Sequence, residues 1–597
     1  MKISKKLRGF KIGNIHVKRT LYADDLTIFL EYDPAQLKEA VNLLHEFYTL
    51  SGLKINTSKT QVVLIGDIPN DNYVLCNELG LKWAQEFRLL GVDFDAKLLD
   101  MNVNYDKAVE KIVKIINNWR FRFITVYGKL TIAKSLLLSK LAHLNLVLPN
   151  LGNDKIDEIE EIILRFIWKT KENTEGKDKV ARQVCKLPEI KGGMNFPNLR
   201  LSMSSSKLSW LRRGFFNQNA TWVGVLNAEL NIYKEGLTLN DILTCMSIED
   251  ICKIKISNPF WESCFRALKT PYLAFLRKYP NLIVDKVIWG SKLVNETDRT
   301  MNRHNNRAIA QEIVTISDAL EYVNNVLVFK SEADLTRGVE YDPAKLANFR
   351  LTLSRYLLNY GIRIGQRSFD NIIARPRVPL ILKIVTIEKK GCSAWNDLVK
   401  GGYSTQGVTA QEVKWENRLN MRLGVNYWNS CYSFLKLLNY NNKQKWLHYQ
   451  ILRKCLMVNY VVAKFKPEVN ENCTFCNNEP ETIQHLFYYC NVSRRFINAS
   501  LIWLRSHGLN IDMQSIDVYD FLFLQRVRNR TFECFFSLLS IKYFIWISRC
   551  NKKNPCVDDF KEWHSKELDL IMHNIEHYPR LGFVARMLNS INNPISP

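Results

Sequence analysis

Residues 15–30 read IHVKRTLYADDLTIFL, and this stretch decides the fold of the N-terminal region. Two runs rich in β-branched and aromatic residues flank Ala23, Asp24 and Asp25. Such runs, joined by a short polar connection, are typical of a β-hairpin. The sequence therefore predicts a hairpin with two adjacent carboxylates at its tip. Hard cations such as Mg²⁺ prefer carboxylate oxygens, so the tip is either a metal site or an ordinary solvated turn.

Outward from the hairpin, helix and strand signals alternate. Asp33 and Pro34 predict the start of a helix, because Asp caps free backbone N–H groups and Pro fits the first turn. Gly52 predicts its end. Two strand-like runs follow, LKINTSKTQVVLIG and FRLLGVDF. We therefore expect residues 1–95 to form an α+β unit.

Beyond this unit the spacing of apolar residues becomes helical, as for Val109, Ile112 and Ile116. We expect an α+β, multidomain chain with four regions. These are the α+β unit at 1–95, a helical region at 96–200, a helical connecting region of unknown role at 201–440, and a C-terminal module with a basic tail at 441–597.

The composition is that of a folded and basic protein. The 597 residues include 83 Lys and Arg against 59 Asp and Glu, which gives a net charge of +24, and 47% of them are apolar. This composition excludes disordered and collagen-like chains. Lys and Arg neutralise phosphates, so the charge favours a nucleic-acid partner. The alternatives are a protein that is merely basic and, more weakly, one that binds an anionic membrane surface.

No sequence feature directs the chain to a membrane or to secretion. The N-terminus is basic but lacks the apolar core of a signal peptide, and the longest apolar run, residues 535–547, is too short to span a bilayer. We therefore expect a nuclear or cytoplasmic protein without a membrane partner. In such reducing compartments, clustered cysteines indicate a metal site rather than disulfides.

A cysteine–histidine cluster near the C-terminus has the spacing of a zinc site. Cys473, Cys476, His485 and Cys490 follow the pattern C-x2-C-x8-H-x4-C. Three thiolates and one imidazole complete a tetrahedral Zn²⁺ site with no open position, so we expect a structural ion. The alternative is four incidental core residues.

The region after this cluster is basic, with aromatic residues interleaved. Such a mixture can contact phosphates and stack bases, or it can form an amphipathic helix with the aromatic side chains in the core. We expect the aromatics to be core residues and the cations to bind nucleic acid. The candidates are Arg494, Arg495, Arg526, Arg528, Arg530, Lys542 and Arg549.

Several motifs, taken in order, resemble those of non-LTR (LINE-type) retrotransposon reverse transcriptases. They are Tyr22-Ala23-Asp24-Asp25, which resembles the YxDD motif; Ser51–Asn56 with Lys59 and Thr60, which resemble the SGLxxN…KT segment; Leu89–Val92, which looks like the primer-grip turn; and Gly192-Gly193-Met194, which is similar to a segment beyond the thumb. The cysteine–histidine cluster resembles the zinc-binding module of the same enzymes. The resemblance implies that the four regions are a partial palm, a thumb, a connecting region and a zinc-binding module.

The resemblance also implies roles for single residues. Asp24 and Asp25 match the carboxylates that hold catalytic Mg²⁺, and Tyr22 matches an aromatic residue near the primer end. Lys59 matches a lysine that donates a proton to pyrophosphate or contacts the nucleotide; the alternative is a solvated lysine at a strand edge. The partners implied are an RNA template and a DNA target or primer.

One element of the family pattern is missing. The palm of these enzymes uses a third carboxylate from an earlier strand, but residues 1–23 contain no Asp and no Glu. We therefore expect a fragment of an RNA-directed DNA polymerase that lacks its N-terminal part and is inactive alone. The alternative is a non-catalytic, zinc-dependent RNA- or DNA-binding module left by a truncated element.

Overall fold

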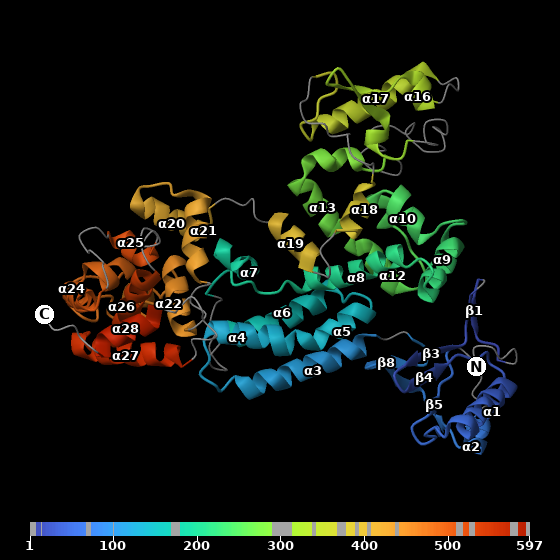
Figure 1. The fold of residues 1–597 in the computed structure, drawn as a ribbon, viewed down its shortest axis with the longest axis horizontal. Helices are drawn as coiled ribbons and strands as arrows, with labels where there is room; N and C mark the ends of the chain where they lie inside the picture. Colours follow the sequence, from blue (N-terminus) through green and yellow to red (C-terminus); the bar gives the residue numbers. More distant parts are fainter. Residues whose placement is uncertain are drawn as a thin grey trace. The chain divides into compact units, whose positions relative to one another are not determined.

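The computed structural model describes residues 7–13, 15–66, 73–98, 101–168, 179–288, 313–336, 342–366, 378–387, 393–402, 408–435, 441–508, 517–524, 532–573 and 583–592. This part of the chain is mainly helical and contains five two-stranded sheets (Figure 1). It is compatible with the α+β class that the sequence predicts. By its internal contacts the chain divides into two compact units. Unit 1 comprises Met1–Ile115, Leu136–Glu161 and Asn198–Tyr403, and unit 2 comprises Ile116–Ser135, Ile162–Pro197 and Ser404–Pro597.

The N-terminal part of unit 1 consists of small sheets and two helices. Its elements are β1 (Phe10–Ile12), β2 (Ile15–Val17), β3 (Arg19–Tyr22), β4 (Asp25–Ile28), α1 (Pro34–Ser51), β5 (Gln61–Val62), α2 (Tyr73–Glu78), β6 (Lys82–Trp83), β7 (Glu86–Leu89) and β8 (Val92–Asp95). The strands pair as β1–β2, β3–β4, β5–β6 and β7–β8, and only β5–β6 is parallel.

The signals for α1 act as expected. The Asp33 side chain accepts a hydrogen bond from the backbone N–H of Ala35, and Pro34 occupies the first turn. Gly52 ends the helix in the left-handed conformation, with φ 75°. The run FRLLGVDF differs from the expected single strand. It folds back as the β7–β8 hairpin, because Leu90 and Gly91 both adopt positive φ, 47° and 85°.

Helices make up most of the remaining described residues of unit 1. They are α3 (Asn102–Trp119, whose last residues belong to unit 2), α5 (Ser139–Val147), α6 (Asn153–Trp168, shared in the same way), α8 (Leu199–Phe216), α9 (Thr221–Tyr233), α10 (Leu239–Cys245), α11 (Ile248–Ile251), α12 (Pro259–Ala267), α13 (Lys269–Lys278), α16 (Glu332–Thr336), α17 (Pro343–Leu358), α18 (Leu380–Val385) and α19 (Ser393–Gly402), with 3₁₀ turns η3 (Pro280–Asp285) and η4 (Ile316–Ala319). One large apolar core joins α8 to α19.

The connecting region at 201–440, expected to be helical, also contains a hairpin. Strands β9 (Leu320–Val323) and β10 (Val326–Phe329) pair antiparallel. The turn between them, Asn324-Asn325, has positive φ at both residues, 50° and 62°. Asn adopts positive φ more readily than most residues, so these two residues form a hairpin turn although the surrounding region is mainly helical.

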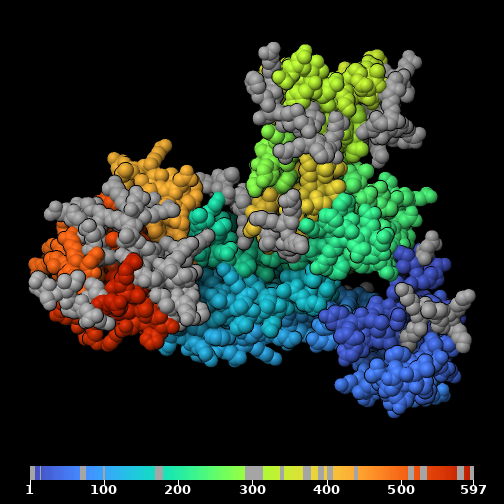
Figure 2. Space-filling view, viewed as in Figure 1, coloured from blue at the N-terminus to red at the C-terminus, as the bar shows by residue number. Residues whose placement is uncertain are grey.

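Unit 2 contains the C-terminal module. Its elements are α4 (Val126–Ile132), the π-helix η1 (Ala133–Leu137), α7 (Arg182–Cys185), the 3₁₀ turn η2 (Glu189–Lys191), α20 (Ala410–Leu419), α21 (Gly424–Ser433), α22 (Asn442–Leu452), α23 (Asn459–Val462), the π-helix η7 (His485–Tyr489), α24 (Asn491–Ser506), α25 (Val518–Phe523), α26 (Phe532–Cys550), α27 (Val557–Met572) and α28 (Phe583–Asn592). Helices α22, α24 and α27 pack on α26, in the orange and red part of Figures 1 and 2.

Among the described residues, one helical stretch, Val126–Val147, is long and apolar enough to cross a membrane. Core helices of soluble proteins pass the same test, and this stretch is interrupted by the π-turn η1. It therefore gives little support for a span.

Candidate metal sites

The four side chains of the cysteine–histidine cluster converge on one point. Their ligand atoms all lie within 4.8 Å of one another. Cys473 Sγ and Cys490 Sγ are 3.8 Å apart, and Cys476 Sγ lies 3.2 Å from His485 Nε2. Two thiolates bound to Zn²⁺ at about 2.3 Å in a tetrahedron are about 3.8 Å apart, and a thiolate and an imidazole are about 3.6 Å apart. The first distance agrees with this geometry and the second is slightly shorter, so the donor set fits zinc.

A tight turn brings Cys473 and Cys476 together. The backbone N–H of Asn477 donates to Cys473 O at 2.9 Å, and Cys473 N–H donates to Glu479 O at 2.8 Å. Asn477 adopts the left-handed conformation, with φ 58°, which Asn accepts more readily than most residues. The sequence CTFCNN is therefore suited to place both sulfurs on the same side of the turn.

His485 and Cys490 lie at the two ends of the π-helix η7. The backbone N–H of Cys490 donates to His485 O at 2.8 Å, five residues earlier. In an α-helix, five residues make about 1.4 turns and would direct the two ligands to different sides. The wider π-turn returns Cys490 to the side of His485. The four-residue spacing between the two ligands is therefore accommodated by a π-turn.

The pKa values of the two facing thiols, Cys473 and Cys490, are shifted in opposite directions. The hydrogen bond from Cys473, together with the backbone amides of Ser493 and Val492, lowers the pKa of Cys490 to about 5 against the opposing effect of burial. The same hydrogen bond and burial raise the pKa of Cys473 above its usual value. Cys490 directly precedes the N-terminus of α24, where a thiolate is stabilised. Cys490 therefore has the stronger tendency of the two thiols to be a thiolate, the form that binds a cation.

A buried carboxylate joins the cysteine turn to two helices. Glu481 is 0% exposed. Its side chain accepts hydrogen bonds from Asn459 N at 2.9 Å, from Thr474 N at 2.9 Å and from Thr474 Oγ1 at 2.6 Å. Arg549 donates to it from Nε at 3.0 Å and from Nη2 at 2.8 Å. Because Thr474 lies between Cys473 and Cys476, Glu481 fixes the turn against α23 and α26.

A second carboxylate lies beside the histidine ligand. Glu479 Oε2 is 2.9 Å from His485 Nδ1, but the contact lacks hydrogen-bond geometry. The nearby negative charge favours a proton at Nδ1, and Nε2 is the atom that faces Cys476. Neither Glu479 nor Glu481 was predicted from the sequence. Their position inside the C-x8-H interval was the available signal.

The predicted nucleic-acid residues divide into three groups. Arg494 and Arg495 are exposed in the first turns of α24, as a phosphate contact requires. Arg526, Arg528 and Arg530 lie outside the described residues.

Lys542 and Arg549 form the third group, and for Lys542 the prediction is wrong. Lys542 is fully buried and donates to Leu522 O at 3.0 Å, at the C-terminal end of α25. Burial lowers its pKa well below the usual value. Helix α26 is mostly apolar and packs against α22, α24 and α27, so its lysine is enclosed between helices. The Arg549 guanidinium donates hydrogen bonds to Glu481 and, at 2.6 Å, to Asn459. It therefore stabilises the residues around the cysteine turn.

The acidic hairpin forms as expected. Tyr22 pairs with Asp25 in the β3–β4 register, and Ala23 begins the two-residue turn with φ 52°. Tyr22 is 67% exposed, and Asp24 and Asp25 are also exposed. Among the described residues, no group of three metal-binding side chains includes either aspartate. Lys59 lies in a separate exposed turn that precedes β5.

The Gly-Gly turn supports the C-terminal module. Gly192 has φ 72°, and a Cβ at Gly193 would lie 2.0 Å from Leu187 O. Tyr449, on α22, donates to Gly192 O at 3.0 Å, and the Tyr432 ring on α21 closes over the same glycine. Only glycine fits at these two positions, because a side chain would separate the turn from both helices.

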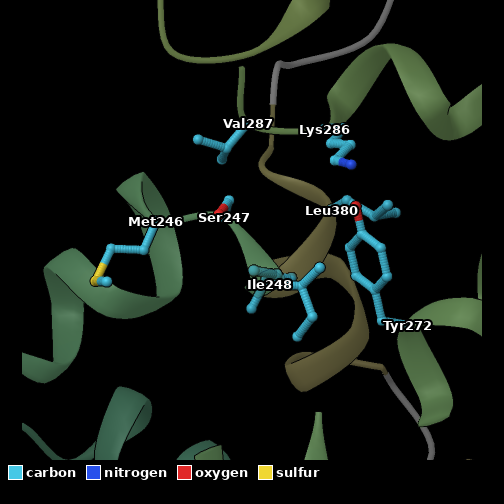
Figure 3. A pocket seen from close by; sticks show the side chains of 8 residues that line it. Met246, Ser247, Ile248, Tyr272, Lys286, Val287 and Leu380 are labelled. Carbon is cyan, nitrogen blue, oxygen red and sulfur yellow. The ribbon is translucent and has the colours of Figure 1, made fainter. Parts of the chain in front are cut away.

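Unit 1 contains a narrow pocket with no room for a water molecule (Figure 3). Its lining is mostly apolar, with Tyr272 and the buried Lys286 on one side. Lys286 pairs with Glu249 at 3.2 Å, and burial lowers the pKa of Lys286. The pair neutralises the one charge in the wall, so this pocket is a packing feature.

Two family models match the chain. Residues 2–94 match "Reverse transcriptase (RNA-dependent DNA polymerase)", a segment that contains the acidic hairpin and Lys59. Residues 393–496 match "zinc-binding in reverse transcriptase", a segment that contains all four ligands of the cysteine–histidine cluster. The cluster and the second match together indicate zinc binding. Over these two segments the chain is therefore similar to a reverse transcriptase domain and to the zinc-binding domain found in reverse transcriptases.

Proposed function

We propose that the chain is the C-terminal portion of a non-LTR (LINE-type) retrotransposon reverse transcriptase. The observation that carries this proposal is the co-occurrence, in order, of the YADD hairpin and a convergent Cys₃His cluster. Between them lie the β7–β8 turn at Leu90-Gly91 and the Gly-Gly turn that seats α22. The corresponding parts are a partial palm, a thumb, a connecting region and a zinc-binding module.

In the complete enzyme Asp24 and Asp25 would hold Mg²⁺ at the hairpin tip. The bound ions would activate the primer hydroxyl and stabilise the leaving pyrophosphate. Tyr22 lies opposite Asp25 in the hairpin register and would support the primer end. Lys59 would contact the incoming nucleotide or donate a proton to pyrophosphate. The zinc cluster has no open ligand position and would hold the module together.

The chain alone is proposed to be inactive in polymerisation. Asp24 and Asp25 are exposed, and no third metal-binding side chain joins them among the described residues. Two such carboxylates bind one ion weakly and do not fix two ions at catalytic separation. The test is primer extension on an RNA template with Mg²⁺, using the full chain and D24A. Extension that disappears in D24A would refute inactivity, and it would confirm the role of Asp24. No extension by either protein is the expected result.

A second candidate is a non-catalytic RNA- or DNA-binding module. It is favoured by the contrast between the exposed aspartates and the ordered zinc cluster beside exposed Arg494 and Arg495. Supplying an upstream polymerase segment separates the two candidates. Only the first predicts that Mg²⁺-dependent nucleotide addition then appears and requires Asp24 and Asp25. Both place the chain with RNA and DNA in the nucleus or cytoplasm.

A further inference from the structure

The connection between α3 and α4 alternates aromatic and basic residues. Residues 119–123 read Trp-Arg-Phe-Arg-Phe and lie within unit 2. Phe121 is 81% exposed and Phe123 is 110% exposed, more than any other large apolar side chain of the described residues except Leu50. Two largely exposed phenyl rings, two residues apart in one loop, are unfavourable for an isolated chain. Exposed aromatic groups of this kind mark interaction sites.

The loop arranges its rings and charges in stacked pairs. The Arg120 guanidinium carbon lies 5.1 Å from the centroid of the Phe121 ring. The Arg122 guanidinium carbon lies 4.8 Å from the centroid of the Trp119 ring. Both distances are those of a cation–π contact. Each cation is therefore held beside an aromatic face in the free protein.

The backbone of the loop is fixed at both ends. Arg122 N–H donates to Trp119 O at 3.2 Å, and Ile124 N–H donates to Arg122 O at 2.9 Å. The Thr125 hydroxyl then caps α4 by accepting from Gly128 N at 3.2 Å. A short loop with these bonds keeps its rings in place, so a ligand meets an arranged surface at a low cost in entropy.

We propose that residues 119–123 form a stacking site for single-stranded nucleic acid. Unpaired bases stack on aromatic rings without regard to sequence, and adjacent Arg side chains neutralise the phosphates. The net charge of +24 favours a polyanionic ligand over an apolar protein segment. The site shares no residue with the Asp24-Asp25 pair or with the zinc cluster, and it does not require either to function.

The test measures binding of the full chain to fluorescein-labelled oligouridylate by fluorescence anisotropy. F121L/F123L keeps apolar side chains but removes the stacking faces. It should weaken binding about 25-fold or more, since each of the two stacked bases contributes at least about fivefold. R120Q/R122Q should reduce the slope of log K against log[salt] by about 1.4, or about 0.7 for each phosphate of the single strand that is no longer neutralised. Binding to a blunt RNA duplex should change little in F121L/F123L, because paired bases cannot stack on the rings.

F216L is the matched control. Phe216 is also exposed, at 64%, and also lies beside an arginine, with Arg212 at 5.6 Å, but it belongs to α8 in unit 1. The control should bind oligouridylate like the unmodified chain. Binding within twofold of the unmodified chain in F121L/F123L would overturn the proposal, and so would an equal loss in F216L. R494Q/R495Q tests the zinc module in the same assay, so failure of that site is distinguishable from failure of this one.

Discussion

Replacing Glu481 with Gln should weaken zinc binding although Glu481 is not a ligand. The carboxylate accepts five hydrogen bonds, from Asn459, Thr474 and Arg549. The Gln amide has nearly the same shape but only one acceptor oxygen. Its NH₂ group would face either the Thr474 donors or those of Asn459 and Arg549, and these donors would lose their acceptor. It also leaves the guanidinium of Arg549, only 15% exposed, without its counter-charge. Unsatisfied buried donors cost about 1–3 kcal/mol, and breaking a buried ion pair costs about 3–5 kcal/mol.

We take about 3 kcal/mol as the net effect, because Arg549 keeps its bond to Asn459 and some exposure to water. Metal binding and folding of such modules are coupled, so this cost appears in the apparent zinc affinity as a loss of about 150-fold. The assay is competition for zinc between the reduced full chain and a chromogenic chelator. The control is E471Q, at an exposed glutamate two residues before Cys473. E481Q with a zinc affinity within threefold of E471Q would refute the reasoning.

Four further results are expected. Removing a ligand in C490S should abolish stoichiometric zinc binding, measured by metal analysis of the reduced protein. R494Q/R495Q should reduce the salt slope of single-strand binding by about 1.4 in a salt titration, and an unchanged slope would exclude both residues as phosphate contacts. Burial lowers the pKa of Lys542 below 10.5, so the unfolded chain binds more protons and stability should rise with pH up to 10.5. K542M should remove that rise in urea unfolding at neutral and alkaline pH. Burial also lowers the pKa of His564 to about 3 from 6.5, so stability should fall as pH falls through this interval, and H564F should remove the fall.

Local sequence chemistry was sufficient for the elements near the acidic hairpin. Asp33, Pro34 and Gly52 determine the limits of α1 through caps and a left-handed turn, and these depend only on nearby residues. The same holds for the hairpin tip at Ala23-Asp24. The four zinc ligands were also identified from spacing alone, because a metal requires particular donors at particular intervals.

Burial depended on contacts that the sequence does not display. Lys542 was predicted to be a surface cation, but α26 is surrounded by other helices and its lysine is enclosed with them. Nothing in the sequence around Glu481 marks it as important. Its role follows from the fold, in which it accepts hydrogen bonds from α23, the cysteine turn and α26. The β9–β10 hairpin was not predicted, because residues 201–440 were expected to be helical and the Asn324-Asn325 turn was not recognised.

The π-turn between His485 and Cys490 also determines which face of α24 points toward the protein core. One residue corresponds to about 100° of rotation around a helix. Deleting a residue from this turn would restore an ordinary α-helical spacing between the two ligands, yet it would rotate the face of α24 relative to the ion. Phe496 and Ile497, now buried, would move toward solvent, and Arg494 would move toward the interior. The extra residue of the π-turn therefore sets the rotation of α24 about its axis. A chain without this residue would still bind the metal, but α24 would no longer pack through its apolar face.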